Sequence, residues 1–272
     1  MRYNLFFLSI LFAFQAQAQS VIMQPSISPD GNHLAFSFQG DIWVSDISGE
    51  NPKRLTIHEA YEASPVWSGD GKSLIFSSDR FGNSDLFKTP VDGGTPTRLT
   101  YHSAGDSPYS VTSFGDILFT TARNYRQVER EAEIFVLEDG ASTEKRFLDA
   151  LGFDPVTSPD GNKIAFVRGT CRIDREAYNG PANRDVWVFD KKTEEYTQIT
   201  KHGTNDFNPH WLDNDNLVFI SGRSGRYNIH TSDLNGNITQ LTDQEDFGII
   251  NFSVSPQSNT IAFQTARQSY TF

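Results

Sequence analysis

The sequence predicts an all-β fold, a β-propeller of four-stranded antiparallel blades with five complete blades and a partial sixth. First, an apolar triad ending in phenylalanine recurs at intervals of 40 to 53 residues. Second, three further strand signals accompany the triads in a fixed order. Third, no amphipathic helix pattern is found after the N-terminus. A repeat near forty residues with four strands per unit is typical of a propeller blade.

The triads are continuous apolar runs rather than alternating ones, which indicates strands buried on both faces between packed blades. They are Leu34-Ala35-Phe36, Leu74-Ile75-Phe76, Ile117-Leu118-Phe119, Ile164-Ala165-Phe166, Leu217-Val218-Phe219 and Ile261-Ala262-Phe263. Asp-Gly pairs at 30–31, 70–71 and 160–161 precede three of them. Such pairs supply the positive φ angle that a tight hairpin needs, so they mark the turn between the first and second strands.

The third and fourth strands recur as well. The third strand starts at Asp41, Asp85, Glu133, Asp185 and Asn228. The fourth reads Arg-Leu-Thr at 54–56 and 98–100, and Gln-Ile/Leu-Thr at 198–200 and 240–242, with only a weak version near 146–148. A β-sandwich is the alternative, but its strands would not repeat one four-part signature in order five times.

The predicted blades span 21–56, 62–100, 106–148, 153–200 and 206–242, and a sixth starts near 249 with two strands. Five blades and a fragment cannot close a ring well, because an incomplete blade exposes a sheet edge. We therefore expect the N-terminal piece of a longer protein. A less favoured alternative is that residues 20–23 complete the last blade, since 21–28 already supply the first strand of blade one.

Composition and the N-terminus indicate a secreted or periplasmic protein. Arg2, an apolar run from Leu5 to Phe14 and the small-residue pattern Ala16-Gln17-Ala18 predict a signal peptide over residues 1–18, followed by the propeller over 19–272. The apolar run is too short for a stable membrane span, although a short anchor is the alternative. The net charge of −11 argues against nucleic acid as a partner. With Cys171 as the one cysteine, no intramolecular disulfide can form.

The repeat units, such as Ser28-Pro29-Asp30-Gly31 followed by Leu34-Ala35-Phe36, resemble the propeller repeats of periplasmic TolB and of tricorn-type proteases. The irregular stretch from Arg168 to Trp187 further resembles the blade-four insertion of secreted bacterial tricorn-like serine proteases. In that family the propeller precedes a PDZ module and a catalytic region with the serine nucleophile. Nothing of that region is present in the sequence, so we expect no catalysis by this chain itself.

The resemblance implies a propeller that gates or positions peptide substrates and docks the downstream PDZ and protease domains, either in a single chain or within a homo-oligomer. Two alternatives remain open. One is a TolB-like protein-binding propeller without enzymatic activity. The other is the gating propeller of a prolyl-oligopeptidase-type hydrolase.

Two groups of candidate site residues are expected on one face of the propeller. Antiparallel order places the strand 2–3 loops and the connections between blades on this face, which we call the inter-blade face. Four acidic residues before the innermost strands, Glu62, Asp106, Asp154 and Asp206, are interpreted as a ring at the channel mouth that favours cationic peptide ends. The alternative is local capping of loops by short acidic side chains.

The second group lies in the enlarged strand 2–3 loops of blades three and four. It comprises seven arginines and one tyrosine: Arg123, Arg126, Arg130, Arg168, Arg172, Arg175, Arg184 and Tyr178. Arginine pairs bidentately with carboxylates, so these loops are a candidate docking surface for other domains or a second subunit. The alternative is local pairing with Glu129, Glu131, Asp174 and Glu176.

Other chemistry is not indicated. His58, His102 and His202 follow a Thr-x-His pattern, which we interpret as loop histidines that bond local backbone rather than as a metal ring. The sequence has no Gly-x-Ser-x-Gly elbow, no glycine-rich phosphate loop and no Cys/His zinc spacing. We therefore expect no catalytic residues, metal or cofactor in this chain.

Overall fold

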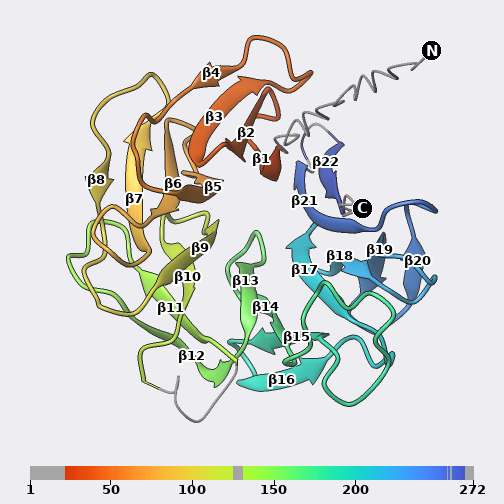
Figure 1. Cartoon of the computed structure of the whole chain (residues 1–272). Coiled ribbons are helices and arrows are strands. Elements are labelled where there is room, and N and C mark those ends of the chain that lie inside the picture. The colour runs from red at the N-terminus through yellow and green to blue at the C-terminus, as the bar shows by residue number, and fades with distance from the viewer. Residues whose placement is uncertain (1–21, 125–130, 256, 258, 267–272) are drawn as a thin grey trace, which may run out of the picture.

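The computed structural model describes residues 22–124, 131–255, 257 and 259–266. Its sheets are arranged in a ring around a central axis, with the first strand of each sheet innermost (Figure 1). The described residues form strands, turns and loops and contain no helix, so none of them forms a helix that could cross a bilayer. The predicted all-β propeller is therefore confirmed, and the predicted signal peptide lies outside the described residues.

Five antiparallel four-stranded sheets form blades one to five. Blade one comprises β1 (Met23–Ile27), β2 (His33–Phe38), β3 (Asp41–Asp46) and β4 (Lys53–Arg54); blade two comprises β5 (Glu62–Trp67), β6 (Ser73–Ser78), β7 (Asp85–Pro90) and β8 (Thr97–Arg98). Blade three comprises β9 (Asp106–Val111), β10 (Ile117–Thr121), β11 (Glu133–Leu137) and β12 (Lys145–Leu151). Blade four comprises β13 (Phe153–Thr157), β14 (Lys163–Arg168), β15 (Asp185–Asp190) and β16 (Glu195–Gln198); blade five comprises β17 (Asp206–Trp211), β18 (Asn216–Ser221), β19 (Asn228–Asp233) and β20 (Ile238–Gln240).

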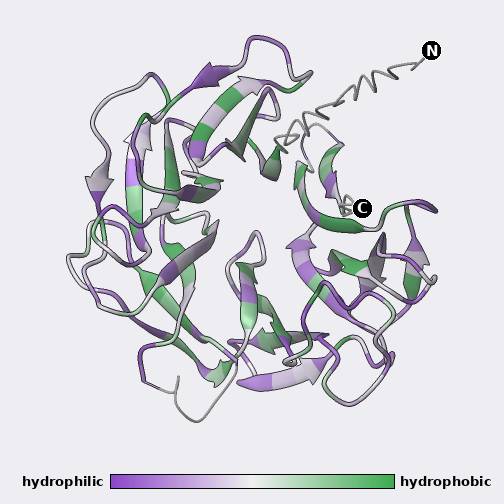
Figure 2. Ribbon diagram, viewed as in Figure 1, coloured by the Kyte–Doolittle hydropathy of each residue, from purple (hydrophilic) through white to green (hydrophobic). Residues whose placement is uncertain are grey.

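The apolar triads form the second strands and supply most of the core. Phe76, Phe119, Phe166 and Phe219 are fully buried, and apolar side chains from adjacent blades pack around them. Figure 2 shows the apolar residues gathered in the strands, whereas the outermost strands β4 and β16 are hydrophilic. The sixth triad differs, because Phe263 is 43% exposed. Among the described residues its sheet has two strands, and no third strand covers this side chain.

The predicted Asp-Gly turns are confirmed. Gly31, Gly71 and Gly161 have φ angles of 76°, 69° and 72°. In the first and third turns, the aspartate accepts hydrogen bonds from a serine hydroxyl and from a backbone N–H two residues on, which lowers the carboxyl pKa. The turn is therefore stabilised by the ionised aspartate as well as by glycine's conformational freedom.

Blade three ends later than expected. The weak fourth strand predicted near 146–148 is β12, which runs on to Leu151. Its pairing with β11 is irregular: Phe135 faces Arg146 but Glu133 faces Leu151. A step of two residues along β11 thus corresponds to a step of five along β12, and this local bulge explains the weak sequence signal.

A two-stranded sheet, β21 (Ile249–Ser255) and β22 (Thr260–Thr265), lies between blade five and blade one (Figure 1). The backbone N–H of Ile27 donates to Ser253 Oγ at 3.0 Å, and that of Gln24 donates to Gln264 Oε1 at 3.0 Å. On the other side, Asn208 Nδ2 donates to the Phe252 carbonyl at 3.3 Å. The ring is therefore closed better than the sequence predicted, because this small sheet contacts both blade five and blade one. As predicted, β1 belongs to blade one, where it pairs with β2.

Candidate functional site at the channel mouth

Four innermost strands carry the same backbone irregularity where they face the channel. Gln24, Ser64, Asp154 and Asn208 have φ angles of 54° to 56°, and each precedes a proline. A shift in strand register accompanies each of them. A positive φ is costly for residues other than glycine, so a conformation repeated four times indicates a constraint imposed by the ring.

These four residues meet at a central cavity of about 200 Å³. Tyr109 of β9 and Asn251 of β21 line it as well. A second cavity of about 100 Å³ shares Gln24, Ser64, Tyr109, Asn208 and Asn251 and extends toward the other ends of the inner strands. The channel is thus lined largely by neutral hydrogen-bonding groups, and its walls come from all six sheets.

Tyr109 joins blade three to blade five across the channel. Its hydroxyl donates to Asn208 Oδ1 at 2.5 Å, and its ring stacks on His210 at 6.1 Å between centroids. Burial raises the pKa of Tyr109 well above its usual value, so the hydroxyl stays protonated and can donate. Burial also lowers the pKa of His210 to about 4, so at neutral pH the imidazole is uncharged and its Nε2–H donates to the Phe252 carbonyl. This polar bridge lies where the two cavities meet.

The four acidic residues predicted to ring the channel have two different surroundings. Glu62, Asp106 and Asp206 are fully buried, and each forms an ion pair with an arginine just after the second strand of its own blade. The partners are Arg80, Arg123 at 2.8 Å and Arg223 at 3.1 Å. These pairs hold the strand 2–3 loop against the inner strand, and none of the three acids lines either channel cavity.

Asp154 alone among the four lines the central cavity. It is a bulge residue itself, two positions further along its strand than the place equivalent to Glu62. Its Oδ2 accepts a hydrogen bond from the Asn208 backbone N–H at 3.1 Å. Burial raises the pKa of its carboxyl, and the positive charge of Arg184 opposes this shift. The mouth therefore holds one acid and one guanidinium rather than a ring of four negative charges.

The loop between β14 and β15, residues 169–184, covers one side of the mouth and is anchored to both neighbouring blades. On the blade-three side, the Gly169 N–H donates to Glu131 Oε1 at 2.6 Å. On the blade-five side, Glu176 accepts from the Tyr227 N–H at 2.5 Å and from Arg226 at 3.0 Å. From this loop Ile173 and Arg184 reach the cavity. The predicted insertion is thus an ordered part of the site.

Gly169 shows why this loop needs its particular sequence. Its φ is 121°, and a Cβ there would lie 2.0 Å from the Asn183 carbonyl oxygen. Only glycine permits this approach of the two ends of the loop. The Arg184 side chain completes the closure, because its Nε donates to the Cys171 carbonyl at 2.8 Å and its guanidinium lies over Phe153.

The predicted docking arginines do not form one surface. Arg123 lies between Asp106 and Glu144 with its side chain 9% exposed, and Arg184 lines the central cavity. Arg168 pairs with Glu131 at 3.3 Å and Arg172 with Asp174 at 2.6 Å, so local pairing occurs at these two positions. Arg126 and Arg130, with Glu129, lie outside the described residues.

The exposed part of the insertion offers a smaller surface than the sequence suggests. Arg175 is exposed, and its guanidinium lies 4.7 Å from the centre of the Tyr178 ring. Together with Glu176 and Arg226 they line an open depression of about 470 Å³. Glu176 pairs with Arg226 and not with an arginine of its own loop.

The loop histidines bond locally, as interpreted from the sequence. Nδ1 of His58 and of His102 accepts the backbone N–H two residues on, at 2.9 and 3.0 Å. His202 Nδ1 bonds Thr204 Oγ1 at 2.9 Å. Within the described part of the chain, no three His, Cys, Asp or Glu residues are grouped so that they could hold a metal ion.

Sequence reasoning missed Gln24, Ser64, Asn208 and Tyr109. The first three share a signal with Asp154, namely a polar residue directly before proline in the innermost strand. Tyr109 carries no such signal, since its importance arises from a partner in blade five.

Comparison with known proteins agrees with this architecture. Residues 19–272 match the family model for the tricorn protease N-terminal β-propeller domain. Tricorn protease homolog 1 of Streptomyces coelicolor is 23% identical over 221 residues, which cover 75% of this chain and 19% of that protein. The chain spans about half or less of the length of the curated relatives it matches.

Two solved structures show the same fold. The putative TolB from Agrobacterium tumefaciens has a TM-score of 0.72 at 21% identity, covering 92% of both chains. The tricorn protease has a TM-score of 0.76 at 16% identity, covering 90% of this chain and 24% of that one. With the family match over 19–272, these findings show that the chain belongs to the tricorn protease N-terminal β-propeller family.

Proposed function

We propose that this chain is a protein-recognition propeller that holds the end of a peptide at its channel mouth on the inter-blade face. The observation that carries the proposal is the cavity of about 200 Å³, in which strained polar residues of separate blades meet Ile173 and Arg184 of the blade-four insertion. Strained backbone at a solvent-accessible cavity is a common mark of a binding site. In a tricorn-like protein, such a site would position substrate peptides for the downstream protease domain.

The size and chemistry of the cavity favour a peptide end over a folded surface. About 200 Å³ accommodates one or two residues, and the polar lining offers hydrogen bonds to a peptide backbone. The carboxylate of Asp154 is the group that would pair with a free amino terminus. Arg184 also lines the cavity, and its positive charge would offset the negative charge of Asp154.

The hydrogen bond between Tyr109 and Asn208 across the channel favours a site that holds the end of a peptide over a channel through which a peptide passes. Because Tyr109 bonds Asn208 where the two cavities meet, a peptide that enters from the inter-blade face would stop there. Gating by threading through the ring would require this buried hydrogen bond to break.

A test compares peptides that differ only at the amino terminus. We expect fluorescein-labelled Ala-Ala-Phe-Lys peptides with a free amino terminus to bind the chain at least ~5-fold more tightly than the acetylated form, measured by fluorescence anisotropy. Asp154→Asn should remove the difference, because the amide keeps the shape but loses the charge. Asp174→Asn, on the exposed part of the same insertion, is the matched control and should preserve it. Equal binding of both peptides would overturn the proposed role of Asp154.

The docking role is proposed for the exposed part of the insertion. In the longer protein, Arg172, Arg175 and Tyr178 would contact the PDZ or protease domain or a second subunit, with β21–β22 serving as a partial sixth blade. Residues 1–18 would direct export before cleavage. Replacing the three side chains with Ala in a chain that carries its downstream region should weaken assembly in analytical ultracentrifugation. Unchanged assembly, with the fold intact by circular dichroism, would reject this role.

A TolB-like binding function without proteolysis is the second candidate. The specific observation in its favour is the match to the putative TolB over 92% of both chains, whereas the chain covers only 24% of the tricorn protease. Both candidates use the same recognition site. They differ in whether a catalytic region follows in the same reading frame, which sequencing downstream of Phe272 determines.

A further inference from the structure

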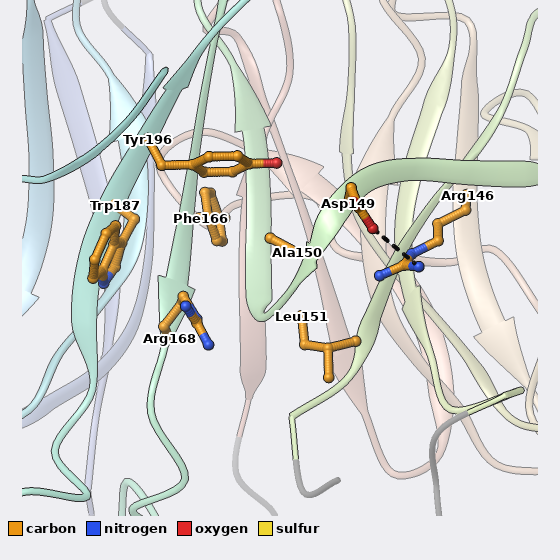
Figure 3. Close-up of a pocket in the computed structure, with 8 residues that line it drawn as sticks. All are labelled: Arg146, Asp149, Ala150, Leu151, Phe166, Arg168, Trp187 and Tyr196. Carbon is orange, nitrogen blue, oxygen red and sulfur yellow. Dashed lines mark ion pairs between the residues drawn. The ribbon is translucent and has the colours of Figure 1, made fainter. Parts of the chain in front are cut away.

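A second site lies at the outer rim, in a cleft of about 440 Å³ between blades three and four. Figure 3 shows Phe166, Trp187 and Tyr196 on the blade-four side, with Arg146 and Asp149 on the β12 side. Arg168 extends from the end of β14 along the lower edge of the cleft (Figure 3). This cleft shares no lining residue with the central cavity, so an inference about it does not depend on the proposed function.

Two departures from the repeat create the cleft. The first is the bulge in β12, since the register with β11 shifts there and no shift occurs in the fourth-strand pairings of the other four blades. The second is at the residue two positions after the phenylalanine of the triad. In blades two, three and five it is a small buried residue, Ser78, Thr121 or Ser221, whereas in blade four it is Arg168, whose side chain is 46% exposed.

Both arginines of the cleft take part in ion pairs near the surface. Arg168, whose side chain is 46% exposed, pairs with Glu131 at 3.3 Å, and Arg146 pairs with Asp149 at 3.4 Å, the Asp149 side chain being 97% exposed. An ion pair as exposed as that of Asp149 contributes little to stability, so a ligand carboxylate can replace Asp149 at low cost, and the exposed Arg168 side chain can bind a carboxylate beside Glu131. A guanidinium matches a carboxylate with two parallel hydrogen bonds.

The aromatic wall gives the cleft an apolar half. Phe166 is fully buried and forms the floor, with the Tyr196 ring edge-on to it at 6.0 Å. Tyr196 is 39% exposed, and Trp187 is partly buried beneath the Arg168 guanidinium. An apolar side chain placed here would lie within reach of both arginines.

We propose that this cleft binds an acidic segment of a partner protein, in which a glutamate or aspartate stands next to an aromatic residue. The carboxylate pairs with Arg168 or Arg146, and the aromatic ring packs against Tyr196 and Trp187. The rim cleft would thus give the propeller a second contact with a protein that the channel mouth also recognises.

The probe for the test is the dipeptide N-acetyl-Glu-Phe-amide, which has no charged terminus. The chain contains four tryptophans, so fluorotryptophan labelling gives four fluorine NMR signals, and Trp187→Phe identifies that of Trp187. We expect the probe to shift the Trp187 signal with millimolar or tighter affinity. N-acetyl-Gln-Phe-amide and N-acetyl-Glu-Ala-amide, which lack the charge and the ring, should each bind at least ~5-fold more weakly.

Arg168→Gln should weaken binding of the charged probe ~10-fold and leave that of the glutamine probe unchanged. Lys53→Gln is the matched control, because it also removes one exposed positive charge but lies in blade one, which contributes no residue to the cleft, so it should have no effect. Should Arg168→Gln alter the circular dichroism spectrum, Tyr196→Ala on the edge strand β16 supplies the second variant, with the same ~5-fold or greater loss expected. Equal binding of the glutamate and glutamine probes would overturn the proposal. So would a Trp187 signal that does not move with up to about 10 mM probe.

Discussion

Blade two and blade four use the same strand pattern but hold their inner strands differently. In blade two, the first residue of the inner strand, Glu62, is buried in an ion pair with Arg80, and Asp85 is paired with Arg98 at 2.7 Å. In blade four the equivalent positions are Gly152 and Asp185, and neither has an arginine partner.

The equivalence of Glu62 and Gly152 rests on the backbone. In each case the N–H donates to the carbonyl just before the third strand of the preceding blade, Gly40 for Glu62 and Ala132 for Gly152. We call the strands and buried ion pairs that repeat from blade to blade the frame. Blade two has both ion pairs of the frame, whereas blade four, which carries the insertion, has neither. The departures from the repeat coincide with the proposed sites, since the central cavity, the insertion and the rim cleft all involve blade four.

The largest effect is expected from breaking the frame in blade two. Arg80→Gln leaves the fully buried Glu62 carboxylate without its guanidinium partner. We expect a loss of about 3–5 kcal/mol in the free energy of unfolding, because a buried charge without its partner is strongly unfavourable. Urea unfolding followed by tryptophan fluorescence measures it.

The double variant Glu62→Gln/Arg80→Gln is the control for that change. It removes both charges, so it should recover at least half of the loss. If Arg80→Gln alone costs less than about 1 kcal/mol, the buried pair is not part of the frame.

A smaller effect is expected at Gly152, where a substitution tests whether blade four has room for a side chain at the position equivalent to Glu62. A Cβ on Gly152 would lie 2.5 Å from the Val167 carbonyl oxygen and 2.8 Å from the Phe166 ring. Gly152→Ala should therefore cost about 2–3 kcal/mol, as overpacking of a rigid site does. Thermal and urea unfolding measure the loss.

Gly105→Ala, just before the inner strand of blade three, is the matched control. A Cβ there would meet its nearest neighbour, Ser84 Cβ, at an ordinary 3.7 Å. We expect a change within about 0.5 kcal/mol. Equal losses for the two alanine variants would show that crowding does not explain the missing acid of blade four.

Much of the frame could be predicted from the sequence, because its strands and turns depend on residues that are close together in the sequence. Phe76 and Phe119 mark buried strands through apolar runs, and Asp30-Gly31 marks a hairpin through turn chemistry. Even the buried ion pairs are periodic, since Arg80, Arg123 and Arg223 follow their triads at a fixed distance. Aligning the blades on the proline of the inner strand would have separated Glu62, which lies three residues before Pro65, from Asp154, which lies directly before Pro155.

The site could be predicted less well, because it depends on the ring. Tyr109 and Asn208 are distant in sequence and belong to blades three and five, so only closure of the propeller brings them together. The rim cleft depends on a bulge in β12 that weakens the strand pattern. Phe263 was expected in the core, but no third strand pairs with its sheet among the described residues.

The smallest effect concerns Asp185, the acid of blade four whose arginine is replaced by Gln198. Its carboxylate accepts from Gln198 Nε2 at 3.1 Å, a neutral donor, and it lies near the negative Asp206. Burial, reinforced by the charge of Asp206, raises the pKa of Asp185 to about 6. The folded state therefore binds a proton more tightly than the unfolded state, and stability falls as pH rises between about 4 and 6. This loss of stability is complete once the pH lies above the pKa of Asp185 in the folded state.

We therefore expect Asp185→Asn to stabilise the protein at pH 7.5 and to have little effect at pH 4. Because Asp185 is only partly buried, solvent screening reduces the gain to about 1 kcal/mol. Asp85→Asn in blade two is the matched comparison. Burial raises the pKa of Asp85 as well, but the charge of Arg98 opposes that shift, and the variant removes the anion that Arg98 pairs with. Asp85→Asn should therefore stabilise the protein less than Asp185→Asn does at pH 7.5. Urea unfolding of both variants at the two pH values measures this difference. If Asp85→Asn stabilises the protein as much as Asp185→Asn at pH 7.5, then the arginine of the repeat does not determine how a blade tolerates its buried acid.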